Sequence, residues 1–289
     1  MTSGTNDITL LQQWTGKTET LHDVVRPEAV AALAATLDYP SAPQHGAPLP
    51  PLWHWINFWT TAPQSGLGPD GHARRGGFLP PVPQPRRMWA GGRLTFPGSV
   101  PVGAAISRTS TILDIAQKTG AGGPLTFVTV RHEIHHDGRL AITEEHDIVY
   151  RDMPAPGSAG PAPKMPPGEA QWTRKIVPDP VLLFRYSALT FNGHRIHYDR
   201  SYVTDVEGYP GLIVHGPLIA TLLMELLRGE LPQARVAAFS FRAVSPLFDT
   251  AAFTVNGRRN ADGTVTLWAA NHHGELAMQA EATLDQESE

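Results

Sequence analysis

The sequence predicts an α+β fold made of two modules, each with a long helix wrapped by an antiparallel sheet. The order helix, helix, antiparallel strands occurs twice along the 289 residues, and a stretch rich in Pro, Gly and Ala separates the two occurrences. A leucine-rich run after His215 repeats at intervals of three and four residues, which is the pattern of a helix with a wide buried face. We therefore expect an N-terminal module at 1–152, a semi-rigid linker at 153–170 and a C-terminal module at 171–289.

Composition narrows the class of protein. A net charge of −4 gives no basic field for nucleic acid or anionic lipid, and the absence of cysteine excludes disulfides and thiolate metal sites. The sequence contains no uncharged apolar run of about 18 residues and no signal-peptide pattern at its N-terminus. We expect a cytoplasmic protein without nucleic-acid or membrane partners. The low charged fraction, 17%, favours a further buried contact between chains, and hence a homodimer.

The first half predicts helices followed by strands. Pro27 begins an Ala- and Leu-rich helix to residue 38, and an aromatic segment at 52–59 follows two prolines and is expected to be a packed core helix. Residues 60–87 form a long irregular loop with four arginines, which is functional or simply solvated. β-Branched runs at 88–96, 104–118, 124–136 and 139–152 predict strands, with a hairpin turn at Asp137-Gly138.

The second half repeats this order. Asp179-Pro180 begins a helix to residue 189, a polar turn and a loop follow, and a long apolar helix extends from 215 to 227. Strands are expected at 235–244, 251–260, 263–271 and 275–284, separated by Asp-Gly and His-Gly turns.

A zinc-protease pattern, H-E-x-x-H, occurs at residues 132–136. That pattern binds metal only on a helix, where residues four apart share a face. Here it ends an alternating run typical of a strand, where His132 and His136 would lie about 13 Å apart. We therefore expect no metal site here, but a strand end whose polar side chains face water.

The candidate chemistry lies between Tyr186 and Met224. Asn192, His194 and His197 fall within six residues, and histidine can give or take a proton near neutral pH. Gly211 and the sequence His215-Gly216-Pro217 follow at the start of the leucine-rich helix, where free backbone N–H groups suit a thioester oxygen that becomes an enolate. The alternative is a tight turn with glycines chosen for packing.

These residues resemble the signature of the MaoC-like, (R)-specific enoyl-thioester hydratases, known as hydratase 2. That signature reads Asp-x-Asn-Pro-x-His and is followed by a region ending in Ile-x-His-Gly. The matching stretches here are Asn192–His197 and Ile213–Gly216, and the strand 239–248 resembles the strand along the family's acyl-CoA groove. The layout is similar to double hot-dog members of the branch that holds mesaconyl- and itaconyl-CoA hydratases and 3-hydroxyacyl-thioester dehydratases.

The resemblance implies a hydro-lyase that reversibly hydrates an enoyl-CoA, without a cofactor and with acyl-CoA as its partner. Branched dicarboxylic thioesters such as mesaconyl-CoA and itaconyl-CoA are among the substrates that it suggests. It implies that His197 activates water and that the N–H of Gly216 polarises the thioester carbonyl, while Asn192 orients the water and His194 or Asp199 is the proton partner. The residues expected to contact substrate are His215, Gly211, Arg242, Tyr198 and Asp199.

Two departures from the signature bear on the chemistry. Asn192 stands where the family has its catalytic Asp, and His194 stands where it has Asn. Because an asparagine side chain cannot act as a base, the alternative is a non-catalytic acyl-CoA binding module that has lost hydratase activity. The N-terminal module has no equivalent histidine turn, so we expect it to be non-catalytic and to shape the pocket for the acyl chain or CoA.

Overall fold

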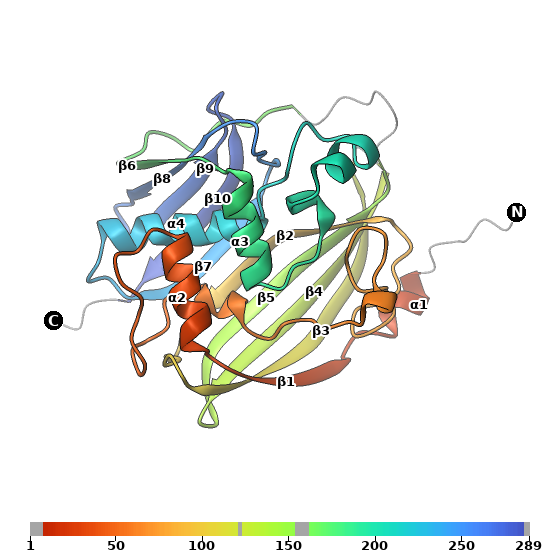
Figure 1. The fold of residues 1–289 in the computed structure, drawn as a ribbon, viewed down its shortest axis with the longest axis horizontal. Coiled ribbons are helices and arrows are strands. Elements are labelled where there is room, and N and C mark those ends of the chain that lie inside the picture. Colours follow the sequence, from red (N-terminus) through yellow and green to blue (C-terminus); the bar gives the residue numbers. More distant parts are fainter. Residues whose placement is uncertain (1–7, 121–122, 154–161, 286–289) are drawn as a thin grey trace, which may run out of the picture.

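A computed structural model describes residues 8–120, 123–153 and 162–285. Its strands form one antiparallel sheet of ten, in the order β1-β3-β4-β5-β2-β7-β10-β9-β8-β6 (Figure 1). The strands are β1 Thr18–Val24, β2 Arg86–Thr95, β3 Ala105–Gly120, β4 Gly123–His136, β5 Arg139–Arg151, β6 Trp172–Ile176, β7 Val236–Ala243, β8 Phe253–Arg259, β9 Val265–Ala270 and β10 Leu276–Leu284.

The two halves of the sheet have the same topology. Counted within its own half, each set of strands follows the order first, third, fourth, fifth, second. The two second strands, β2 and β7, pair at the centre of the sheet, from Gly91 opposite Arg242 to Thr95 opposite Ala238. The repeated element order predicted from the sequence is therefore a repeated topology, and one continuous sheet joins its two copies.

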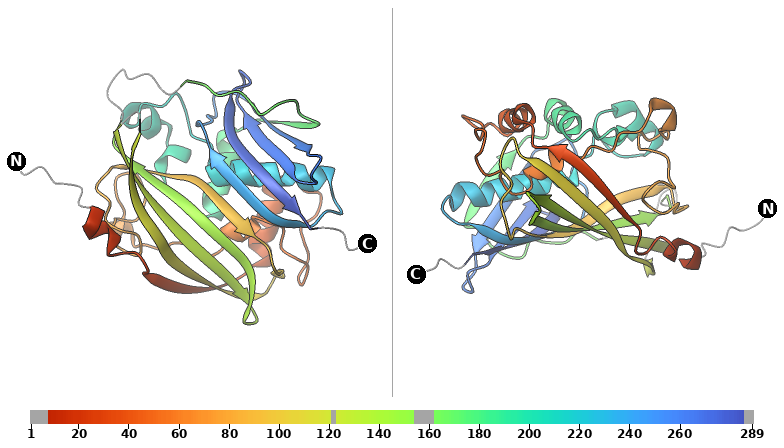
Figure 2. Two further views of the ribbon diagram at one scale, coloured as in Figure 1. Left: turned by 180° about the vertical axis from the view of Figure 1, so that it is seen from behind. Right: turned by 90° about the horizontal axis from the view of Figure 1, so that it is seen from below.

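The helices lie mainly on one face of this sheet, as Figure 2 shows for α2, α3 and α4. The α-helices are α1 Ile8–Gln12, α2 Pro27–Thr36, α3 Pro180–Leu189 and α4 Gly216–Glu230. Short turns complete the set: the 3-10 helices η1 Trp53–Ile56, η2 Gln64–Gly66 and η3 Arg195–His197, and the π-helix η4 Tyr202–Val206. No helix in the described ranges is both long and apolar enough to span a bilayer.

The centre of the C-terminal half is α4. Every residue from Leu218 to Leu227 in this helix is buried, and the strands β8, β9 and β10 pack against it. A helix that is apolar around most of its circumference must be enclosed on several sides, so the sheet curves around it. Removing one of these leucine side chains would cost about 2–5 kcal/mol of stability. The long helix predicted for this module is confirmed.

The N-terminal half has no helix of comparable length among its described residues, and the helix predicted at 52–59 is only the single turn η1. The backbone of Leu52 (φ 71°) and of Phe58 (φ 57°) is left-handed, which ends the turn on both sides. Trp53 is fully buried and donates its indole N–H to Glu225 Oε1 in α4 at 2.8 Å. The predicted core packing of these aromatic rings is confirmed, whereas the helix is not.

The strand predictions are otherwise confirmed, with two omissions. Neither the polar segment that forms β1 nor the segment that forms β6 was predicted as a strand. These two strands form the two outer edges of the sheet. Of the predicted linker, residues 154–161 lie outside the described residues, and residues 162–170 contain no helix or strand.

Candidate active site

Residues of the polar turn after α3 themselves fix its shape. Phe191 adopts a left-handed conformation (φ 49°), and the side-chain oxygen of Asn192 accepts the backbone N–H of His194 at 3.0 Å. This Asx turn directs the chain into η3, which ends at His197. The only oxygen of the Asn192 side chain thus already holds the turn in shape.

His197 lies against the start of α4. Its Nδ1–H donates to the carbonyl oxygen of Ile213 at 2.7 Å, which leaves Nε2 as the free, basic nitrogen. Its ring stacks on that of His215, with centroids 3.7 Å apart and planes 17° apart. Because burial disfavours the charged form, the pKa of His197 falls to about 4, and the ring is neutral at pH 7. The ring of His197 therefore lies close to the start of α4, as the sequence predicted.

The first residue of α4 has open space above it. A methyl group on Gly216 would meet no heavy atom nearer than Met278 at 4.0 Å, so packing does not require glycine at this position. His215, directly before it, shares a hydrogen bond of 2.8 Å with Ser187 of α3, which fixes its ring. The first N–H groups of a helix have no partner within the helix and can stabilise a negative charge that develops next to them.

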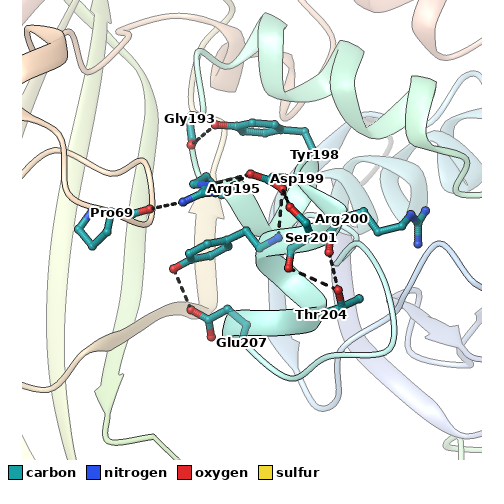
Figure 3. Close-up of polar contacts among 10 residues, drawn as sticks. Pro69, Gly193, Arg195, Tyr198, Asp199, Arg200, Ser201, Thr204 and Glu207 are labelled. Atoms are coloured by element: carbon teal, nitrogen blue, oxygen red, sulfur yellow. Dashed lines mark hydrogen bonds and ion pairs between the residues drawn. The ribbon is translucent and has the colours of Figure 1, made fainter.

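Two further predicted residues are engaged in local contacts, shown in Figure 3. One carboxylate oxygen of Asp199 accepts two N–H groups from Arg195, at 2.9 and 2.7 Å, and the other accepts the hydroxyl of Ser201 and the N–H of Tyr202. Tyr198 donates its hydroxyl to the carbonyl oxygen of Gly193 at 2.9 Å. These contacts give Asp199 and Tyr198 a role in holding the local structure. That they also contact the substrate remains a prediction.

Neither Gly211 nor Arg242 has a contact that assigns it to the site. A methyl group on Gly211 would lie 2.5 Å from Asp249 Oδ1, so packing alone requires this glycine. Arg242 is exposed on β7, whereas its neighbour Phe241 is buried in the core with α4. Since strand side chains alternate, Arg242 points to the opposite face of the sheet. The structure therefore does not bring Arg242 together with His197.

Asp70 and His72 were not predicted as site residues, and the loop between β1 and β2 places them beside the histidine turn. Asp70 Oδ2 accepts the ring Nδ1–H of His72 at 2.9 Å. The ring centroids of His72 and His194 lie 4.1 Å apart, and those of His194 and His197 lie 5.5 Å apart. Asp70, His72 and His194 offer one nitrogen or oxygen each within 4.8 Å of one another, and they are the one such group within the described ranges that could hold a metal ion.

A pocket of about 320 Å³ opens at this cluster. Its lining includes Asp70, His72 and His194 and also four arginines: Arg74, Arg75, Arg86 and Arg87. Among the described residues, only Arg86 of these four pairs with a carboxylate, that of Glu207 at 3.0 Å. The pocket thus has an excess of positive charge and is large enough for a small ligand.

The H-E-x-x-H segment lies on β4, a strand, as predicted. The expectation that its side chains face water is wrong for His132, which is only 8% exposed and shares a 2.8 Å hydrogen bond with Ser110. Its ring lies 4.5 Å from that of His146, which is bonded to the buried Glu144. The alternation of the strand turns His132 inward, where a polar network on neighbouring strands receives it.

Comparison with known proteins identifies the family of this chain. Residues 52–249 match the family model of hydroxyacyl-thioester dehydratase type 2. The chain belongs to this family. It is 50% identical over 272 residues to mesaconyl-C(4)-CoA hydratase of Chloroflexus aurantiacus, covering 94% of this chain and 96% of the relative. It is 28% identical to the mitochondrial hydroxyacyl-thioester dehydratase type 2 of Schizosaccharomyces pombe, over 69% of this chain and 74% of that protein.

Solved structures support the fold. A MaoC-like dehydratase superposes with a TM-score of 0.70 at 14% identity and covers 95% of this chain and 99% of its own. A Mycobacterium tuberculosis protein described as a double hotdog superposes with a TM-score of 0.54 at 14% identity, over 93% and 96% of the two chains. The predicted α+β double hot-dog class is confirmed.

Proposed function

We propose that this chain is a hydro-lyase that adds water reversibly to a 2,3-unsaturated acyl-CoA. The observation that carries the proposal is the neutral His197, whose ring stacks on His215 at the start of α4 and whose Nε2 is left unprotonated by the Nδ1–H contact to Ile213. In the hydration direction, Nε2 takes a proton from water while the water oxygen bonds to the β-carbon. The electron pair of the double bond moves onto the thioester oxygen, where the N–H groups at Gly216 stabilise it. The proton then passes from His197 to the α-carbon.

The acyl group we propose is a dicarboxylic one of the mesaconyl type. The relative from Chloroflexus aurantiacus is named for that substrate, and the two chains align over nearly their full lengths. A mesaconyl thioester carries a second, free carboxylate that needs a cationic partner. Arg87 borders the pocket together with His72 and His194, and after burial its positive charge is a further, smaller cause of the lowered pKa of both histidines. We propose that Arg87 binds this carboxylate, since a guanidinium matches a carboxylate with two hydrogen bonds.

The test is turnover of crotonyl-CoA and mesaconyl-CoA, followed by loss of the enoyl-thioester absorbance, with the purified chain and with His197→Ala. We expect turnover with both substrates, a higher kcat/KM for mesaconyl-CoA, and a loss of about 10²–10⁴-fold in kcat for the variant. Tight binding of these thioesters without turnover would instead identify a binding module that lost activity at Asn192. Unchanged rates in His197→Ala would remove this residue from the mechanism.

A further inference from the structure

The site contains one carboxylate–histidine pair that the family signature does not supply. The signature places its Asp at position 192, where this chain has Asn, and the Asn192 oxygen is already bonded to the backbone of His194. Asp70 and His72 approach the same histidine turn from the loop between β1 and β2. The turn thus lacks the carboxylate of the signature but has the carboxylate of Asp70 close to it.

The loop is docked on the turn by backbone contacts. The N–H of Arg195 donates to the carbonyl oxygen of Asp70 at 2.9 Å, and the Arg195 guanidinium donates to that of Pro69 at 3.0 Å. Gly71 has a positive φ of 87°, and a methyl group there would lie 1.9 Å from the carbonyl oxygen of Gly193. Only glycine permits this approach, so the position of the loop against the turn is fixed.

Within the loop, Asp70 sets the orientation and tautomer of His72. Its Oδ1 accepts the backbone N–H of His72 at 3.1 Å, and its Oδ2 accepts the ring Nδ1–H at 2.9 Å. The ring therefore carries its proton on Nδ1 and leaves Nε2 as an acceptor, as in other carboxylate–histidine pairs. The imidazole of His72 lowers the pKa of Asp70, which stays ionised. Burial lowers the pKa of His72, so the ring is neutral at pH 7.

A metal ion is a poorer explanation of the cluster. While Asp70 Oδ2 accepts the Nδ1–H of His72, these two atoms do not both bind one ion. This leaves two histidine nitrogens, fewer than the three or four protein ligands that zinc sites use. A basic nitrogen that lines the pocket at His72, together with an ionised carboxylate behind it, is instead the arrangement of an acid–base group.

We propose that His72, oriented by Asp70, is the second group that holds and orients the attacking water and takes over the role of the family Asp. The inference rests on the proposed hydratase function. His72 Nε2 accepts a hydrogen bond from one hydrogen of the attacking water, while His197 removes the other and later returns it to the α-carbon. The atoms of one water molecule are thus divided between the α- and β-carbons. His72 contacts the reacting water, and Asp70 is a positioning residue that acts through it.

The test compares His72→Gln, Asp70→Asn and the double variant His72→Gln/Asn192→Asp with wild type, using mesaconyl-CoA. His273→Gln, which changes an exposed histidine in the β9–β10 turn, is the matched control. We expect a loss of about 10²-fold in kcat for His72→Gln with KM within about threefold, and recovery of at least about tenfold in the double variant. Asp70→Asn should lower kcat and move the acidic limb of its pH profile to lower pH, because the carboxylate raises the pKa of His72.

Thermal unfolding of each variant establishes that it is folded, and the glutamine retains an N–H donor for Asp70. A kcat for His72→Gln within about twofold of wild type, or a loss that Asn192→Asp does not relieve, overturns the proposal. So does inhibition of wild type by a chelator that zinc reverses, since the cluster would then be a metal site. Turnover that is lost in His197→Ala and retained in His72→Gln rejects this inference alone, whereas a wild type without turnover rejects the proposed function itself.

Discussion

The buried, neutral histidines should make this protein unstable in weak acid, and His197 allows the size of the effect to be worked out. In the unfolded chain its pKa is near 6.5, and in the folded protein burial lowers it to about 4. Between these values the unfolded chain binds a proton that the folded protein does not. Stability is therefore fully present above pH 6.5 and is lost as the pH falls toward 4.

At one pH unit per 1.36 kcal/mol, this histidine alone removes about 2 kcal/mol of stability between pH 7 and pH 5. The pKa values of His72, His194 and His215 are also lowered by burial, so the total loss is larger. The assay is urea unfolding at pH 7 and pH 5 for wild type and for His197→Asn, whose amide N–H replaces the donor to Ile213.

The variant should be less stable than wild type at pH 7 because it loses the stacking on His215. Its further loss on going to pH 5 should nevertheless be smaller by about 2 kcal/mol. The control His273→Asn changes an exposed side chain, and its loss between the two pH values should match wild type within about 0.5 kcal/mol. If His197→Asn loses as much stability as wild type, the ring is not held neutral by burial and the electrostatic description of the site is wrong.

Three further changes test other parts of the site. Arg87→Met should lower kcat/KM for mesaconyl-CoA by about 10–100-fold and leave that for crotonyl-CoA nearly unchanged, because only the former has a free carboxylate; equal losses would remove Arg87 from specificity. Gly216→Ala should keep the thermal stability of wild type, since the added methyl meets no heavy atom nearer than 4.0 Å, and should reduce kcat by about tenfold or more because the methyl would crowd the thioester at the helix start. Trp53→Ala should destabilise the fold by about 3–5 kcal/mol in urea unfolding, because it empties a buried site and removes a donor to Glu225.

The part of the site that the sequence could predict is the part that is local in the chain. His197, Gly216 and the residues between them lie in one stretch, and a helix that begins at His215-Gly216-Pro217 places its free N–H groups next to that stretch. The alternating runs likewise predicted most strands. The turn η1 was predicted as a longer helix because proline entry and apolar content say nothing of the left-handed residues Leu52 and Phe58, which tertiary packing imposes.

The contribution of Asp70 and His72 could not be predicted in this way. Pro69 and Arg195 are 126 positions apart, and backbone carbonyl groups make the contacts that dock the loop. Every residue has such a group, so the sequence carries no side-chain signal for this contact. The segment Pro69-Asp70-Gly71-His72 reads as an ordinary turn. Only the close approach of Gly71 to Gly193, which requires two glycines, would have connected the two segments.

The asymmetry between the two halves of the sheet follows from these features. Both halves have the same strand order, but only the C-terminal half has a long helix between its first and second strands among the described residues. In the N-terminal half the segment between the first and second strands instead forms α2, the aromatic turn η1 and the loop that contains Asp70 and His72. Because that segment is not wound into one buried helix, its loop can reach the histidine turn of the other half. We infer that the half predicted to be non-catalytic supplies the carboxylate that the signature of the catalytic half lacks.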